Sequence, residues 1–317
     1  MSTQQISQAQ APAHTRIDAG HKPLTLSPES VQAFKDWGFL VVENALSAAE
    51  VQGLQDEAAR ICRNDFSTRE AKADEAASEL SDVEVQKKYL CIHFPHKASE
   101  LLKASLAHPS VVEVLKKVVA PDVKAVQSML FIKASGKPGQ AWHQDEDYLA
   151  TRDRSLIGAW ISMDKATVEN GCLWVIPGSH KSGILWQQKW HGDKRFDCSE
   201  VSVDFPYTDA DAIPVEVPAG SIVFFNGYLL HRSLPNVAKE GFRRALVNHY
   251  CSAQSHLVWE PRKPEMNLAK VDIRDYDMVC GTDPYAWKGK EEIHFPHVRP
   301  AGEGGCGPTR VYKEMGG

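Results

Sequence analysis

Short runs of β-forming residues, separated by turns rich in glycine, proline and asparagine, extend from Val123 to Ser252 in this 317-residue chain. Strands of this length that recur along a sequence are typical of antiparallel barrels and jelly rolls. Such folds bring residues from distant strands together. The polar residues that interrupt the apolar runs are therefore the first candidates for a functional site.

Helical patterns precede the β region. Ser47 and Glu50 form a capping box that opens a helix through about Arg63. Pro28 marks the start of an earlier helix, and Gly38 marks its end. We expect these helices, a strand over 39–42 and a helix over 111–119 to support a sheet and to carry no chemistry.

The stretch 141–148 reads Ala-Trp-His-Gln-Asp-Glu-Asp-Tyr. If it is extended, the side chains of His143 and Asp145 leave the same face of the strand and form half of a metal site. Buried histidine and aspartate also serve as hydrogen-bonding partners in cores, which is the alternative. A second His-x-Asp, at 191–193, lies among charged residues without a β pattern, and we interpret it as a solvated loop.

A further candidate lies in the stretch 220–236, which predicts a strand, an Asn226-Gly227 turn and a second strand. His231 closes its apolar run. Together with His143 and Asp145 it supplies two imidazoles and one carboxylate, the set that iron(II) oxygenases use while three metal positions stay open. The same ligands bind zinc or manganese, so a cupin-like metal-dependent hydrolase or isomerase is an alternative.

The next strand, over 241–250, contains two neighbouring arginines, Arg243 and Arg244. Because side chains alternate along a strand, one should point inward and the other outward. An inward guanidinium beside Fe²⁺ and Asp145 would balance the charge of a bound 2-oxo dicarboxylate, and its planar fork holds a carboxylate through two hydrogen bonds. A surface arginine pair on an edge strand is the alternative.

Six segments, in their order along the chain, resemble the phytanoyl-CoA dioxygenase family of iron(II)/2-oxoglutarate oxygenases. They are Met129–Lys133, Trp142–Asp145, Ala159–Met163, Asn170–His180, His231–Asn236 and Phe242–Ala245. The similarity extends from about residue 27 to 252 and is most specific in its central and C-terminal motifs. It implies a mainly β fold with flanking α-helices around a double-stranded β-helix, the cupin-like jelly roll.

The resemblance also implies a set of site residues. Those that match the iron ligands are His143, Asp145 and His231. Those that match the lining of the 2-oxoglutarate pocket are Met129, Trp160 and Ser233. Arg243 matches the residue that holds the far carboxylate of 2-oxoglutarate, but the loop before it is one residue longer than usual, which leaves Arg244 as a rival. His180 matches a structural turn and not a ligand.

The activity implied by this resemblance is hydroxylation of a C–H bond in a small-molecule substrate. Fe(II) would be the bound cofactor, 2-oxoglutarate and O₂ would be consumed, and succinate and CO₂ would be released. Asp145 leaves no vacant ligand position for a halide, so we expect oxygenation and not halogenation. Residues close to the triad in sequence are candidates for substrate contacts: Trp142, Gln144, Tyr148 and Lys133. A non-catalytic metabolite-binding jelly roll is the remaining alternative.

We expect one oxygenase domain over residues 21–252, with helical support to about 122 and the jelly-roll core over about 123–252. Residues 1–20 are expected to be a disordered leader and 253–317 an extended C-terminal arm. The irregular, aromatic stretch 181–213 is either a lid or substrate loop or a packed insertion that covers the barrel. His93 and His96 are expected to have a pocket-rim or structural role, because Pro95 disfavours the helix that would turn both toward a metal.

Composition excludes several classes of partner. The formal charge is −5 and the pI about 6.2, without a basic block that would suggest nucleic acid. No apolar run approaches the length of a membrane span. Seven scattered cysteines indicate free thiols in a reducing compartment. The chain does not end in a peroxisomal tripeptide, so we expect a cytoplasmic enzyme with a small-molecule substrate; the oligomeric state is unknown.

Overall fold

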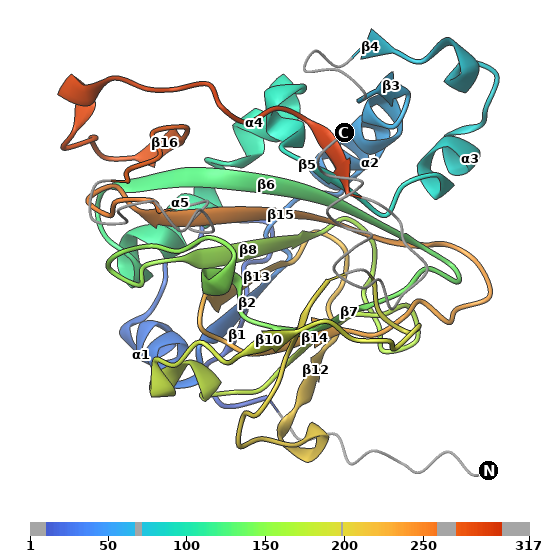
Figure 1. The fold of residues 1–317 in the computed structure, drawn as a ribbon. Helices are drawn as coiled ribbons and strands as arrows, with labels where there is room; N and C mark the ends of the chain where they lie inside the picture. Colours follow the sequence, from blue (N-terminus) through green and yellow to red (C-terminus); the bar gives the residue numbers. More distant parts are fainter. Residues whose placement is uncertain (1–10, 67–71, 198, 259–270, 300–317) are drawn as a thin grey trace.

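Two open β-sheets form the centre of the protein (Figure 1). The computed structural model describes residues 11–66, 72–197, 199–258 and 271–299. Within these ranges the larger sheet has nine strands and the smaller sheet four, and each sheet combines strands from distant parts of the sequence. This arrangement confirms the predicted fold class, a jelly-roll core with flanking helices.

The strands of the larger sheet follow one another in the order β1 (Arg16–Asp18), β2 (Phe39–Glu43), β13 (Ile222–Asn226), β8 (Ile157–Ser162), β15 (Phe242–Ser252), β6 (Val123–Ala134), β5 (Cys91–His93) and β17 (His297–Arg299), and β16 (Asp277–Cys280) also pairs with β6. The smaller sheet has the order β12 (Ile213–Val215), β9 (Leu173–Val175), β14 (His231–Ser233) and β7 (Gln140–His143). Two short ribbons are separate: β3 (Asn64–Asp65) with β4 (Lys72–Ala73), and β10 (Gln188–Lys189) with β11 (Val201–Ser202).

Helices cover the outer face of the larger sheet. They are α1 (Pro28–Trp37), α2 (Ala48–Ile61), α3 (Asp82–Lys87), α4 (Glu100–Ser105) and α5 (Pro109–Val118). Short 3₁₀ turns are η1 (Glu75–Ala77), η2 (Pro95–Lys97), η3 (Asp145–Asp147), η4 (Ser179–Ser182), η5 (Asp209–Asp211) and η6 (Ala286–Lys288). The predicted capping box is present, because the Ser47 hydroxyl accepts from the Glu50 backbone N–H and the Glu50 carboxylate accepts from that of Ser47.

The two faces of the larger sheet bury different clusters of side chains. On β6, Leu130 and Ile132 belong to the cluster that includes the helices. Met129, the residue before Leu130, belongs to a second cluster with Val175 of the smaller sheet. Because side chains alternate along a strand, the odd-numbered residues at the centre of β6 face the interior between the two sheets. Part of the polar site described below lies on this inner face, and the rest lies on, or directly after, the facing strands β7 and β14 of the smaller sheet.

Two local expectations were wrong. Residues 141–148 are not one extended stretch, because β7 ends at His143 and η3 begins at Asp145. Residues 220–236 do form the predicted strand, turn and strand, with β13 in the larger sheet and β14 in the smaller one. Part of the expected leader is ordered, since β1 pairs in parallel with β2. Residues 1–10 lie outside the described ranges.

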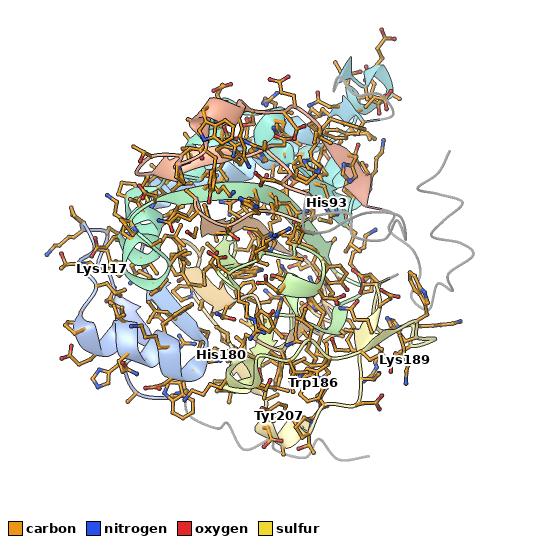
Figure 2. All side chains as sticks on the ribbon, turned by 60° about the vertical axis from the view of Figure 1, so that its left-hand side comes forward. His93, Lys117, His180, Trp186, Lys189 and Tyr207 are labelled. Carbon is orange, nitrogen blue, oxygen red and sulfur yellow. The ribbon has the colours of Figure 1, made fainter. Side chains whose placement is uncertain are left out.

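The aromatic stretch 181–213 packs on the outer face of the smaller sheet. There the guanidinium of Arg232 stacks on the ring of Trp142, with 4.5 Å between the guanidinium carbon and the ring centroid, and pairs with Asp209 at 2.9 Å. Figure 2 shows Trp186 and Tyr207, both from this stretch, in the lower part of the view, away from His93. These contacts favour the packed insertion over the lid.

The described part of the C-terminal arm, 271–299, lies along the edge of the larger sheet. Strand β16 pairs with the start of β6, and β17 pairs with β5. The imidazole rings of His93 and His297 stack there, with 4.9 Å between their centroids. No helix within the described ranges combines the length and apolar character needed to cross a bilayer.

Candidate metal and co-substrate site

The predicted triad converges between the two sheets. His143 and His231 are register partners in the paired strands β7 and β14, and their ring centroids are 4.1 Å apart. Asp145, at the start of η3, places Oδ1 at 3.6 Å from Nε2 of each histidine. The three side chains are buried, and one ligand atom from each lies within 4.8 Å of the others. This spacing is suited to a single metal ion.

Backbone contacts orient both imidazoles. Nδ1 of His143 lies 2.7 Å from the carbonyl oxygen of Ala141, and Nδ1 of His231 lies 2.9 Å from that of Leu229. A carbonyl oxygen only accepts, so each Nδ1 carries the proton and each Nε2 directs its lone pair toward Asp145. This is the tautomer that binds a metal through Nε2.

The carboxylate of Asp145 has a buried partner that the sequence analysis did not identify. His249 of β15 donates from Nε2 to Oδ2 of Asp145 over 2.8 Å. Burial opposes ionisation of Asp145, but His231, His249 and His143 outweigh it and hold its pKa below the usual range. The carboxylate is therefore ionised at neutral pH. Alternation from Arg243 places His249 on the same inner face of the strand, a signal present in the sequence.

The two neighbouring arginines point in opposite directions, as predicted. Arg243 is only 2% exposed; its Nε donates to the carbonyl of Gly171 over 3.1 Å, and its guanidinium carbon lies 5.4 Å from the ring centroid of Trp160. Its Nη1 is buried and has no hydrogen-bond partner among the described residues. Burial lowers the pKa of Arg243 to about 10, so it remains a cation at neutral pH. Arg244 instead pairs with Asp164, at 2.7 Å.

Lys133, expected near the substrate, lies beside Arg243 instead. The two residues are register partners in β6 and β15. Nζ of Lys133 donates to Oγ of Ser233 and to the carbonyl of Leu234, each over 2.8 Å. Burial, and then the charge of Arg243, lower the pKa of Lys133. Ser233, Lys133 and Arg243 thus form one polar group. Ser233 and Arg243 were predicted to contact 2-oxoglutarate, and Lys133 was predicted to contact the substrate.

Met129 and Trp160 flank this group on the inner face. Both are register partners of Val247, which separates Arg243 from His249 along β15. The row of Met129, Val247 and Trp160 therefore lies between the arginine end of the site and the triad. An elongated ligand that reached both ends would cross this apolar row.

The other predicted substrate contacts have different positions. Trp142 is wrong as a pocket residue: its neighbour His143 occupies the inner face, so Trp142 packs outside, against Arg232. The amide of Gln144 donates to the carbonyls of Ile184 and Tyr228 and accepts from the N–H of Trp186, so it fastens the insertion to the site.

Tyr148 lies nearest to the triad among these candidates, since its ring meets that of His143 edge-on with 6.2 Å between centroids. His93 and His96 are not part of the cluster of metal-binding groups in the described ranges. Their place at the pocket rim stays a prediction.

Comparison with known proteins identifies one protein family whose model matches this chain. The model of the phytanoyl-CoA dioxygenase (PhyH) family matches residues 34–245. A similar relative is phytanoyl-CoA dioxygenase domain-containing protein 1 of Danio rerio, 28% identical over 273 residues that cover 74% of this chain and 93% of that protein.

Solved structures agree in fold. The apo form of ThoJ, a non-heme monooxygenase, has a TM-score of 0.59 at 21% identity and covers 80% of this chain and 84% of its own. SnoK, a non-heme α-ketoglutarate-dependent carbocyclase from nogalamycin biosynthesis, has a TM-score of 0.57 at 19% identity, with 81% and 99% covered. The chain belongs to the phytanoyl-CoA dioxygenase family of non-heme enzymes, which use Fe(II), 2-oxoglutarate and O₂.

Proposed function

We propose that this protein is a 2-oxoglutarate-dependent dioxygenase that hydroxylates a C–H bond of a small-molecule substrate and releases succinate and CO₂. The observation that carries the proposal is the joint presence of two half-sites in the space between the two sheets. One is the buried group of His143, Asp145 and His231. The other is the buried cation Arg243, whose Nη1 has no partner among the described residues.

The donor set of the first half-site fits Fe(II). Two neutral imidazoles and one ionised carboxylate are the ligands of non-heme iron oxygenases, and they leave room for further ligands. The short contacts of both Nδ1 atoms with backbone carbonyls present Nε2 to the ion. His143, Asp145 and His231 would therefore hold the iron.

The second half-site fits a dicarboxylate. Arg243 and Lys133 are both buried, and within the described ranges neither forms an ion pair with a carboxylate. A buried cation without a counter-ion is costly, and a bound carboxylate would remove that cost. Arg243 would hold the far carboxylate of 2-oxoglutarate, with support from Lys133 through Ser233.

The protein's own residues orient and shield the reactants. Arg243 and Lys133 fix one end of the co-substrate, and the row of Met129, Val247 and Trp160 excludes water along its length. Bound Fe(II) supplies the activation of O₂ that is coupled to oxidative loss of CO₂ from 2-oxoglutarate. Because this chemistry belongs to the cofactor, the chain needs no general acid or base of its own.

The test is turnover of 2-oxoglutarate by protein loaded with Fe(II), in the presence of O₂ and a panel of small metabolites. We expect succinate to form together with a product that has gained one oxygen atom, labelled when ¹⁸O₂ is used. A product that has instead lost two hydrogens would indicate desaturation or ring closure at the same site. Absence of iron-dependent 2-oxoglutarate consumption across the panel, with no binding of 2-oxoglutarate, would refute the proposal.

A further inference from the structure

The two oxygens of the Asp145 carboxylate have separate partners. Oδ1 faces the triad, at 3.6 Å from Nε2 of both His143 and His231. Oδ2 faces the larger sheet and accepts the hydrogen bond of His249 over 2.8 Å. One oxygen of the carboxylate therefore faces the two histidines, and the other is held by a residue of β15.

We propose that His249 is a positioning residue that holds Oδ2 of Asp145 away from the metal, so that the carboxylate binds through Oδ1 alone. The inference rests on the proposed function. Its consequence is the number of metal positions left open. A carboxylate bound through both oxygens would occupy one of the positions that 2-oxoglutarate and O₂ need.

The burial of His249 supports a specific role. The side chain is 3% exposed, and its Nδ1 is buried without a hydrogen-bond partner in the described part of the chain. Leaving a polar atom unpaired in a protein interior costs free energy. An apolar side chain would fill the same space without that cost. Among the contacts of the described residues, the hydrogen bond to Asp145 is the one that requires an imidazole at this position.

The opposite face of the same strand provides a matched control. Tyr250 follows His249 but points to the helices, where its hydroxyl donates to the carbonyl of Leu106 over 3.0 Å. Tyr250→Phe removes one buried hydrogen bond from the same strand without touching Asp145. It should lower the melting temperature and leave metal binding unchanged.

The experiment measures binding of Co(II), used as a spectroscopic probe, to metal-free wild-type protein and to three variants of His249. His249→Leu and His249→Asn remove the donor that reaches Oδ2, whereas His249→Gln keeps an N–H at a similar distance. We expect the Kd for Co(II) to rise on the order of 10–100-fold in the Leu and Asn variants, as is usual when the partner of a metal ligand is lost. We expect the Gln variant to stay within about five-fold of wild type.

The absorption spectrum gives a second readout that a structural role would not change. In the Leu and Asn variants the Co(II) bands should shift toward those of a higher coordination number, and 2-oxoglutarate should perturb them less than in wild type. Melting temperatures of the metal-free proteins identify variants that fail to fold. If the Leu variant does not fold, the Asn variant takes its place in the test.

The failures are distinguishable. Wild-type Co(II) affinity and spectrum in a folded Leu or Asn variant would overturn the role of His249 and leave the proposed function intact. A folded wild-type protein that binds neither Co(II) nor 2-oxoglutarate would overturn the proposed function itself.

Discussion

Arg244 donates to both carboxylate oxygens of Asp164, over 2.9 Å from Nε and 2.7 Å from Nη2. The backbone N–H of Arg244 also donates to this carboxylate, over 2.7 Å. Arg244 is thus satisfied within the protein, on the face of β15 opposite Arg243. Arg243, and not Arg244, therefore points into the space between the two sheets.

This difference predicts opposite phenotypes for two adjacent substitutions. Arg243→Gln should raise the KM for 2-oxoglutarate by roughly 30-fold or more, because a buried charged partner of the carboxylate is lost. Arg244→Gln should lower the melting temperature and change that KM by less than about two-fold. Initial rates of succinate formation against 2-oxoglutarate concentration, with thermal unfolding in parallel, measure both. The reverse pattern would assign the co-substrate to Arg244.

Asp145→Ala should abolish the stabilisation that a divalent metal gives to the folded protein. Saturating metal, at about a hundred times its Kd, should add roughly 2.7 kcal/mol to the unfolding free energy of wild type. The chain contains a matched control in its second His-x-Asp, where Asp193 pairs with Arg195 at 2.6 Å in a loop. Asp193→Ala should keep the full metal-induced shift in melting temperature. An equal loss in both variants would exclude a specific site at Asp145.

The sequence predicted the triad and the fold but not the cross-sheet contacts. His143 could be identified from its His-x-Asp spacing, His231 because it closes an apolar run, and Arg243 from alternation along its strand and from the family resemblance. Trp142 was misplaced because closeness in sequence does not place neighbours in a strand on one face. The Asn226-Gly227 turn was predicted correctly, but turn residues do not specify whether the strands they join belong to one sheet, and here they belong to two.

His249 shows what local patterns leave out. Alternation from Arg243 puts it on the inner face, but its partner Asp145 lies 104 residues earlier in the chain. Which residues of two distant strands meet depends on the register of the whole sheet, and here that register includes an irregularity between His249 and Tyr250. A pattern read along one strand contains no information about this offset.

Asp275 should determine how firmly the C-terminal arm is attached. Its buried carboxylate accepts from Lys97 and from Nδ1 of His294, the latter over 3.0 Å. Asp275→Ala should lower the unfolding free energy by about 1–3 kcal/mol and speed proteolysis of the arm, because it removes the buried acceptor of two partly buried donors. The exposed pair of Asp36 and Lys181 is the control, and Asp36→Ala should stay within about 0.5 kcal/mol. Urea unfolding and timed proteolysis test this; equal effects of both variants would contradict it.

Gly158 should tolerate no side chain, because a Cβ there would lie 2.4 Å from the ring of Phe225. That ring packs against His231, with 4.7 Å between centroids. Gly158→Ala should cost about 1–3 kcal/mol of stability and weaken metal binding through displacement of Phe225. Gly53 in α2 has open space around it, and Gly53→Ala should stabilise by up to about 1 kcal/mol. Chemical unfolding and Co(II) titration of the two variants measure these effects. Unchanged metal affinity in a destabilised Gly158→Ala protein would disprove the link between Gly158 and His231.

Glu146 should make stability fall as pH rises. Its Oε1 accepts from the N–H and hydroxyl of Thr151, over 2.7 and 2.5 Å, whereas its Oε2 is buried without a partner in the ranges described. Burial raises the pKa of Glu146 to about 7. Between about pH 4.5 and 7 the unfolded chain has released this proton while the folded protein retains it, so stability declines across that window, by roughly 3 kcal/mol at most. Glu146→Gln keeps an acceptor for Thr151 and removes the titration. Between pH 5 and pH 8 the unfolding free energy of wild type should therefore fall relative to that of the variant. A difference between the two proteins that is constant with pH would show that Glu146 is ionised in the folded protein throughout this range.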